Sequence, residues 1–175
     1  IPHIVIFICR FLCERSGVMT IPDIHPDERI DEINEYISAY FDDMLEMIKT
    51  TDFDVLSHMT CPLRYISGKY GIAVDLKEFA DKTDIILKEI IDRSIALEIN
   101  TSCLDTDYNF FMPDIPIIKR YKELGGYLLT LGSDAHIAKR IAHGFDYALS
   151  ELSRLGFKNI YYYKNRKPIP QEIKL

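Results

Sequence analysis

The sequence predicts an α/β protein with parallel strands, because segments of helical and strand-like spacing alternate along the chain. Four times, a stretch whose apolar residues recur every three or four positions is followed by a short apolar run of strand length. Such helix–strand rounds are typical of parallel sheets with crossover helices. The pattern fits either an open doubly wound sheet or part of a β/α barrel.

The first two rounds occupy residues 28–57 and 75–100. A helix is predicted at 28–49, where one face collects Ile30, Ile33, Ile37, Tyr40, Phe41, Met44 and Ile48. A strand at 53–57 follows it. The second predicted helix, at 76–91, has Asp75 as its N-cap and leads into a strand at 95–100.

The last two rounds complete the predicted order. A helix at 113–125 ends at paired glycines and precedes a strand at 127–132. A final helix is predicted at 137–155, with Ile141, Phe145, Leu149 and Leu152 on one face, and a strand at 159–163 follows. No repeat or flexible linker interrupts the chain, so we expect residues 1–175 to form a single domain.

The composition narrows the classes of function. The 175 residues carry a net charge of −6 and are 47% hydrophobic, which excludes a disordered tail and a basic nucleic-acid-binding domain. A small phosphorylated metabolite is a better partner than a nucleic acid. The first apolar run is too short to span a bilayer, and the four cysteines include no CxxC pair. We expect a cytoplasmic protein with reduced thiols and no membrane contact.

Chemically useful side chains follow three of the predicted strands. His58, Asn100 and the pair Asp134 and His136 stand where parallel strands present their carboxyl ends, the usual place for an active site. Asp134 and His136 are one residue apart, so an extended backbone directs both to one side. Carboxylate oxygen and imidazole nitrogen suit Zn²⁺, Mn²⁺ or Fe²⁺. The spacing also fits a helix-capping Asp with a surface His, and a core role for His58.

Several of these runs resemble the polymerase and histidinol phosphatase (PHP) superfamily, in its histidinol-phosphatase branch. The run 54–59 (DVLSHM), with Arg64 and Tyr65 after it, looks like the family's fifth-strand motif. The runs 97–102 (LEINTS) and 132–136 (GSDAH) are similar to its next strand and its last metal motif. The agreement in order and spacing extends over roughly residues 30–168.

The resemblance implies the C-terminal part of a distorted (β/α)7 barrel of parallel strands that holds up to three divalent ions. It implies that His58, Asp134 and His136 are metal ligands, and that a metal-activated water hydrolyses L-histidinol phosphate in histidine biosynthesis. No catalytic side chain is assigned. Arg64 is a candidate clamp for the substrate phosphate, because a guanidinium matches two phosphoryl oxygens, although an exposed loop arginine is an equal alternative.

The departures from the family set further expectations. The family begins with a His-x-His pair, which this sequence lacks, and neither His3 nor His25 stands in a matching context. We therefore expect a missing N-terminal portion, fewer than three bound ions, little phosphatase activity from this chain alone, and an open sheet edge that a homo-oligomer contact could cover. The alternatives are a degenerate domain without catalysis and a related metal-dependent hydrolase of non-phosphate substrates.

Three further groups have structural interpretations. Glu98 shares a strand face with Asn100 and is expected to support the site rather than bridge metals. His143 is expected on the surface of the last helix. Tyr161, Tyr162 and Tyr163 are predicted to alternate between buried and exposed faces of a strand, and not to stack on bases.

Overall fold

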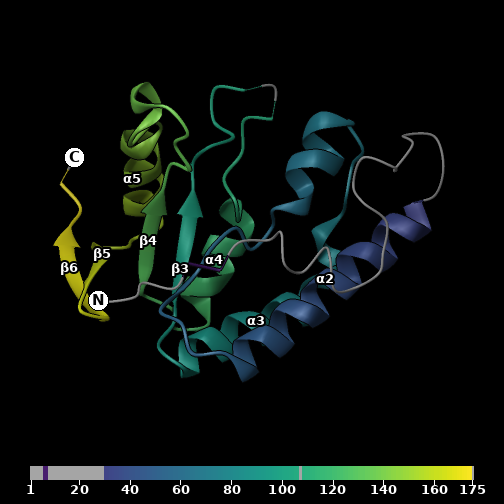
Figure 1. Ribbon diagram of the computed structural model, residues 1–175, viewed down its shortest axis with the longest axis horizontal. Helices are drawn as coiled ribbons and strands as arrows, with labels where there is room; N and C mark the ends of the chain where they lie inside the picture. The colour runs from purple at the N-terminus through teal and green to yellow at the C-terminus, as the bar shows by residue number, and fades with distance from the viewer. Residues whose placement is uncertain (1–5, 8–29, 107, 175) are drawn as a thin grey trace.

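The computed structural model describes residues 6–7, 30–106 and 108–174, and a parallel sheet lies at its centre (Figure 1). The sheet has the order β1 (Ile6–Phe7), β2 (Val55–Leu56), β3 (Ala96–Asn100) and β4 (Leu129–Gly132), with every neighbouring pair parallel. The predicted strands at 53–57, 95–100 and 127–132 each contain one of these elements. The α/β class with parallel strands is confirmed.

The first helix, α2 (Ile30–Thr50), confirms the helix predicted at 28–49, of which residues 28 and 29 lie outside the described part. Its apolar stripe is buried except for Ile30 at the first position, which is 61% exposed. Its charges complement the helix dipole, with Asp31 and Glu32 in the first turn and Lys49 in the last. The helix carries the large side chains of the core, and it packs along α3 (Ala80–Asp92).

The second and third predicted helices are also present. The 3₁₀ turn η3 (Leu76–Phe79) leads into α3, and the Asp75 side chain accepts a hydrogen bond from the Lys77 amide at 3.0 Å, as expected of an N-cap. The next helix is α4 (Ile115–Glu123), which contacts α3. Figure 1 shows α2 and α3 running together below the strands.

One large apolar cluster joins these helices to the sheet. Its fully buried members include Ile48 of α2, Ile86 and Ile90 of α3, and Leu97 and Ile99 of β3. Complete burial of one such side chain stabilises a fold by about 1.5–3 kcal/mol. The core therefore fixes the three helices beneath the sheet and leaves the carboxyl ends of the strands to the connecting loops.

The helix predicted at 137–155 is half as long as expected. Residues Ala138–Arg140 form a 3₁₀ turn, and α5 runs only over Phe145–Arg154. Gly144 has φ +76°, a left-handed conformation that interrupts the helical path, and Ile141 is 70% exposed instead of packing on the helix face. The remaining residues of the predicted helix, 137–144, instead belong to the loop between β4 and α5, which also contains Asp134 and His136.

The predicted fourth parallel strand is present but does not join the parallel sheet. Strand β5 (Asn159–Lys164) pairs antiparallel with β6 (Lys167–Glu172), which the sequence pattern did not predict. Asn165 and Arg166, both at positive φ, form the two-residue turn between them. The tyrosines alternate as predicted: Tyr161 and Tyr163 pack on a small buried cluster, and Tyr162 is 53% exposed.

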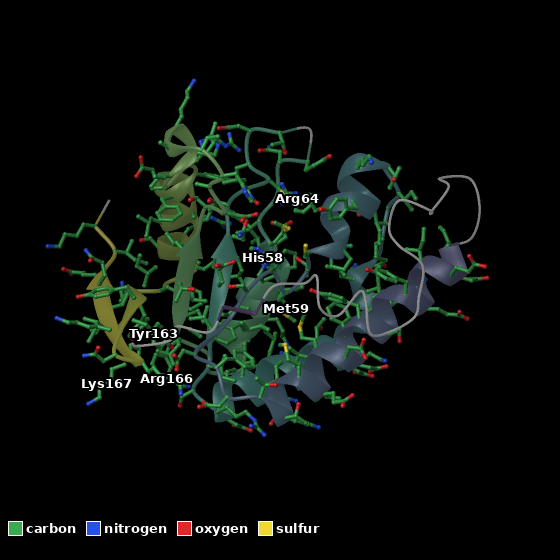
Figure 2. All side chains as sticks on the ribbon, viewed as in Figure 1. His58, Met59, Arg64, Tyr163, Arg166 and Lys167 are labelled. Atoms are coloured by element: carbon green, nitrogen blue, oxygen red, sulfur yellow. The ribbon has the colours of Figure 1, made fainter. Side chains whose placement is uncertain are left out.

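An ion-pair cluster fixes the turn of this hairpin to the start of β2. The Arg166 guanidinium donates to both oxygens of Asp52, at 2.6 and 2.7 Å, and to both oxygens of Asp54, at 3.1 and 3.2 Å. Figure 2 places Tyr163, Arg166 and Lys167 together, away from His58 and Arg64. The hairpin is thereby anchored at the opposite end of the strands from the candidate site.

The described residues also bear on membrane contact and on the thiols. No helix among them is long and apolar enough to cross a membrane. Cys61 and Cys103 are free thiols, whereas Cys9 and Cys13 lie outside the described residues.

Candidate metal and phosphate site

The candidate residues lie at the carboxyl end of the parallel sheet, as their positions after the strands predict. His58 follows β2 by two residues, Asn100 is the last residue of β3, and Asp134 follows β4 by two residues. Parallel pairing brings these ends to one edge, and the register sets Asn100 opposite Gly132. The site is therefore assembled from three neighbouring strands.

His58 has a left-handed backbone that two hydrogen bonds stabilise. Its φ is +57°, which is uncommon for a residue with a β-carbon and usually costs free energy. Its carbonyl oxygen accepts from the buried Tyr40 hydroxyl of α2 at 3.1 Å and from the Cys61 amide at 2.8 Å. These contacts hold the backbone of His58 in this conformation.

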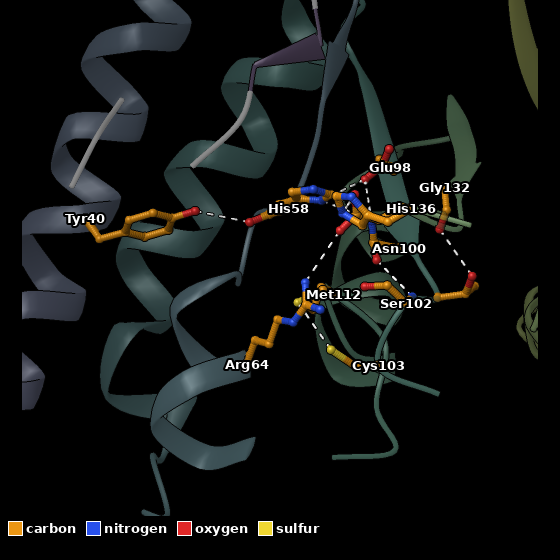
Figure 3. A network of polar contacts seen from close by, with 12 residues as sticks. Tyr40, His58, Arg64, Glu98, Asn100, Ser102, Cys103, Met112, Gly132 and His136 are labelled. Atoms are coloured by element: carbon orange, nitrogen blue, oxygen red, sulfur yellow. Dashed lines mark hydrogen bonds and ion pairs between the residues drawn. The ribbon is translucent and has the colours of Figure 1, made fainter. Parts of the chain in front are cut away.

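The imidazole of His58 lies in a buried polar network on β3 (Figure 3). Its Nδ1 atom is 3.0 Å from Glu98 Oε1 and 3.1 Å from Asn100 Nδ2. Asn100 Nδ2 also donates to Glu98 Oε1 at 3.2 Å, and Asn100 Oδ1 accepts from the Ser102 amide at 3.0 Å. Glu98 and Asn100 share one face of β3, as strand alternation predicts.

Glu98 is ionised in this network although it is buried. Only 10% of its side chain is exposed. Burial acts to raise the pKa of the carboxyl, but its hydrogen bond and electrostatic attraction with His58 and its hydrogen bond with Asn100 outweigh burial and hold the pKa of Glu98 below its usual value. A buried carboxylate of this kind is a strong hydrogen-bond acceptor.

The second cluster joins Asp134, His136 and Arg64. His136 Nε2 lies 3.4 Å from Asp134 Oδ1, and Arg64 donates to Asp134 Oδ2 at 3.5 Å. Asp134 has φ +44°, so it too has a left-handed backbone, and 27% of its side chain is exposed. The His136 side chain is 85% exposed. The predicted carboxylate–imidazole pair is therefore present on the open side of the sheet edge.

Arg64 begins a short π-helix rather than lying in an irregular loop. The helix spans Arg64–Lys69, and the Arg64 side chain is 34% exposed. A π-helix is rare and is often found at functional sites. The guanidinium is held near Asp134 and is still accessible to an anion from solvent.

The loop after β4 is fastened to the end of β3. Thr101 Oγ1 donates to the His143 carbonyl at 2.6 Å, and the Arg140 guanidinium donates to the Ser102 carbonyl at 3.3 Å. Because α5 begins at Phe145, His143 precedes this helix instead of lying on its surface as predicted. The His143 Nε2 atom is 3.2 Å from Asp105 Oδ2. This fastening supports the backbone that carries Asp134 and His136.

The donor atoms fit a divalent ion in chemistry, although they form two groups. Asp134 and His136 offer carboxylate oxygen and imidazole nitrogen side by side, and the contact of His58 with Glu98 is made by Nδ1, so Nε2 of His58 is not part of that contact. Within residues 30–106 and 108–174, no three His, Cys, Asp or Glu side chains are already gathered around one point. His3 and His25 lie outside the described residues.

Sequence reasoning missed some residues of the site. Tyr40 and Arg140 belong to no sequence motif. Their hydrogen bonds to the carbonyls of His58 and Ser102 depend on how α2 and the β4–α5 loop pack. The contact between Glu98 and His58 had a usable signal, because both belong to neighbouring strands of the predicted sheet. The strand register, which the sequence does not specify, was the missing information.

The relatives of the chain are consistent with this geometry, although no family model matches it. Proteins named "Probable histidinol-phosphatase" from Clostridium acetobutylicum and Thermotoga maritima are 34% and 31% identical over 131 and 125 residues. These alignments cover 74% and 71% of this chain and 51% of each relative. The chain thus spans about half the length of the curated relatives that it matches.

Solved structures give the same result for the fold. The histidinol phosphate phosphatase of Lactococcus lactis, crystallised with Zn, L-histidinol and phosphate, superposes with a TM-score of 0.65 at 26% identity, covering 79% of this chain and 51% of that one. A structure from Listeria monocytogenes, at 19% identity and a TM-score of 0.52, shares the fold over 70% of this chain. As the motif resemblance to the PHP superfamily predicted, the chain is histidinol-phosphatase-like in sequence and in fold, over about half the length of those relatives.

Proposed function

We propose that this chain contributes the strand-end metal ligands and the phosphate-binding arginine of a histidinol-phosphatase-like phosphomonoesterase. The observation that carries the proposal is the contact of His58 Nδ1 with the buried Glu98 carboxylate, at the sheet edge where β4 presents Asp134 and His136. A carboxylate behind one imidazole nitrogen is the usual support of a metal-bound histidine.

In this proposal His58, Asp134 and His136 bind divalent metal, and Zn²⁺, Mn²⁺ and Fe²⁺ all suit their nitrogen and oxygen donors. Bound metal would supply a water of lowered pKa at neutral pH and would neutralise phosphoryl oxygens. The described residues would then have simple tasks. The Asp134 carboxylate is oriented by its contact with Arg64. His58 is held in place by the hydrogen bond from Tyr40 to its carbonyl oxygen and by the contact of its ring with Glu98.

Arg64 is proposed to bind the substrate phosphate. Its contact with Asp134 is long, at 3.5 Å, and a third of its side chain is exposed, so its guanidinium can turn toward a phosphoryl group without losing a buried ion pair. Two parallel N–H donors match two phosphoryl oxygens. The histidinol phosphatases that resemble this chain make L-histidinol phosphate the first substrate to test.

We further propose that the parallel sheet belongs to a (β/α)7 barrel within a single domain. The supports are the parallel order β1 to β4 and the superposition on the Lactococcus lactis structure. The β5–β6 hairpin would then be an addition to the parallel strands rather than the next barrel strand.

The test is phosphate release from L-histidinol phosphate by the purified chain supplied with Zn²⁺ or Mn²⁺. A panel of other phosphomonoesters and a carboxylic ester runs beside it, and Asp134→Asn is the inactive control. Turnover that prefers L-histidinol phosphate and is lost in Asp134→Asn supports the proposal. Because the chain spans about half the length of its relatives, a low rate is expected, and the comparison with Asp134→Asn decides the outcome. Equal phosphate release by the natural sequence and Asp134→Asn, or turnover of the carboxylic ester in preference to every phosphomonoester, would contradict the phosphatase assignment.

A further inference from the structure

The Glu98 carboxylate occupies space that β4 leaves open at Gly132. A β-carbon at residue 132 would lie 2.6 Å from Glu98 Cδ, and closer still to Oε2, so no other side chain fits there without moving the carboxylate. The backbone of Gly132 has no positive φ that would itself require glycine. The absence of a side chain at 132 is explained by the place it gives to Glu98.

Asn100 is held in one orientation beside this carboxylate. Its Oδ1 accepts from the Ser102 amide, so its Nδ2 must face Glu98 and His58. Nδ2 lies 3.1 Å from His58 Nδ1, close enough to donate a proton to an unprotonated Nδ1. The imidazole therefore has two candidate neighbours at Nδ1: an acceptor in Glu98 and a donor in Asn100.

These two neighbours favour opposite tautomers of His58. If Nδ1 carries the proton, it donates to Glu98 Oε1, and the lone pair of the ring is on Nε2. If Nε2 carries the proton, the Nδ1 lone pair faces a lone pair of the Glu98 carboxyl oxygen at 3.0 Å, which is repulsive in a buried site. A hydrogen bond to a charged acceptor is about twice as strong as a neutral one, so the carboxylate decides the outcome.

We propose that Glu98, seated against Gly132, is a positioning residue that holds His58 in its Nδ1–H tautomer and thereby presents Nε2 as the ligating nitrogen. The tautomer follows from the contacts of β3 alone. Its consequence for metal binding rests on the proposed function, in which His58 is a ligand. Asn100 keeps the carboxylate in place by donating to the same oxygen.

The tautomer is measured directly by long-range hydrogen–nitrogen correlation spectra of the purified, metal-free chain labelled with nitrogen-15 histidine. Spectra at alkaline pH report which ring nitrogen of each neutral imidazole carries the proton, and His58→Asn identifies the His58 signals. We expect His58 in the Nδ1–H form in the natural sequence. In Glu98→Gln, whose side chain has the same size but no charge, Asn100 can donate to Nδ1 and the signals should shift to the Nε2–H form.

Two further variants separate positioning from general destabilisation. Gly132→Ala should displace the carboxylate and shift the tautomer as Glu98→Gln does, with Glu98 itself intact. Glu123→Gln changes an exposed glutamate at the end of α4 and should leave the His58 signals unchanged. A His58 that is already Nε2–H in the natural sequence, or that stays Nδ1–H in Glu98→Gln, would overturn the proposal.

Zinc titration of the same proteins tests the consequence for metal binding. Loss of a supporting carboxylate typically weakens metal affinity by about 10–100-fold, and we expect this of Glu98→Gln but not of Glu123→Gln. If the tautomer shifts as expected but zinc binds neither protein, the positioning role of Glu98 stands and the proposed function fails. If zinc binds and the Glu98→Gln affinity equals that of the natural sequence, the positioning proposal fails instead.

Discussion

Tyr40 of α2 donates its hydroxyl to the carbonyl oxygen of His58 at 3.1 Å, which links the longest described helix to the candidate metal ligand. The Tyr40 side chain is buried in the main core, with 4% exposed. The contact stabilises a residue whose φ of +57° is unfavourable by itself. Core packing and the geometry of the site are therefore coupled through one hydrogen bond.

Tyr40→Phe is expected to lower the free energy of unfolding by about 1 kcal/mol, the usual net value of one hydrogen bond. The Cys61 amide still satisfies the His58 carbonyl, so the variant should fold. Denaturant titration measures the change, with the exposed Tyr127→Phe as the matched control. Equal unfolding free energies for Tyr40→Phe and the natural sequence would show that this contact does not stabilise the fold.

Gly144→Ala is expected to destabilise the loop that carries Asp134 and His136. A β-carbon at 144 would meet Leu104 at 2.6 Å, and the residue also has φ +76°. A left-handed alanine costs about 1–2 kcal/mol, and overpacking adds about 1–3 kcal/mol. Gly71→Ala is the control, because Gly71 has φ +66° but open space around it.

The difference between these two glycine variants isolates the steric effect. Thermal and chemical unfolding should give a larger loss for Gly144→Ala than for Gly71→Ala, by at least about 1 kcal/mol. If both variants lose the same amount, the packing of Gly144 against Leu104 contributes nothing beyond backbone strain.

Arg64→Ala is expected to raise KM for a phosphomonoester roughly tenfold or more, because a hydrogen bond to a charged group is worth about 1.5–3 kcal/mol. The value of kcat should change less, since Arg64 is proposed to bind the phosphate and not to activate water. Steady-state kinetics and inhibition by inorganic phosphate measure both effects. Arg93→Ala, which removes an arginine paired with Glu89 on α3, is the control.

Arg64→Lys refines this test, because lysine keeps the charge but loses the two parallel donors. We expect only partial recovery of KM in this variant. A fall in kcat at unchanged KM in Arg64→Ala would instead place Arg64 at the reacting group, contrary to the proposal.

The stability of the fold is expected to depend on pH through Tyr163, which lies on strand β5 of the hairpin. Burial, with a contribution from the negative charge of Asp54, raises the pKa of Tyr163 to about 12. A raised tyrosine pKa means that the native state resists ionisation, whereas the unfolded chain ionises near pH 10. Its stabilising contribution is thus complete below about pH 10 and is lost as the pH rises toward 12.

Tyr163→Phe should therefore flatten the loss of stability above about pH 10, since phenylalanine cannot ionise in either state. Denaturant titrations between neutral and alkaline pH measure the slope. The exposed Tyr162→Phe should leave the slope as it is in the natural sequence. A slope that is the same in Tyr163→Phe and Tyr162→Phe would contradict the role of burial at Tyr163.

The sequence predicted those parts of the fold that have a periodic or local sequence pattern. The stripe of α2, the cap at Asp75 and the apolar runs of β2 to β4 are local signals, and all were confirmed. Strand β6 was missed because Pro168 and Pro170 argue against a strand. They stand at alternate positions of an edge strand closed by a two-residue turn, where their missing N–H groups face away from β5.

The candidate site was predictable residue by residue but not as a network. The positions of His58, Asp134 and His136 after their strands were enough to make them candidates from the sequence. The sequence could not indicate that Gly144 would end the helix early, because a glycine within an apolar period is compatible with either outcome. Nor could it give the register that brings Glu98 onto His58, because that contact depends on pairing across strands.

The most direct test of the central claim is the zinc content of the purified chain, determined by elemental analysis together with its intact mass. The account predicts at least one but fewer than three zinc ions per chain, with a lower content in Asp134→Asn. Asparagine tolerates the φ of +44° at this position, so a loss of zinc would reflect the missing carboxylate charge and not misfolding. A chain that holds no zinc, or an Asp134→Asn variant with the same zinc content as the natural sequence, would contradict the assignment of this sheet edge as a metal site.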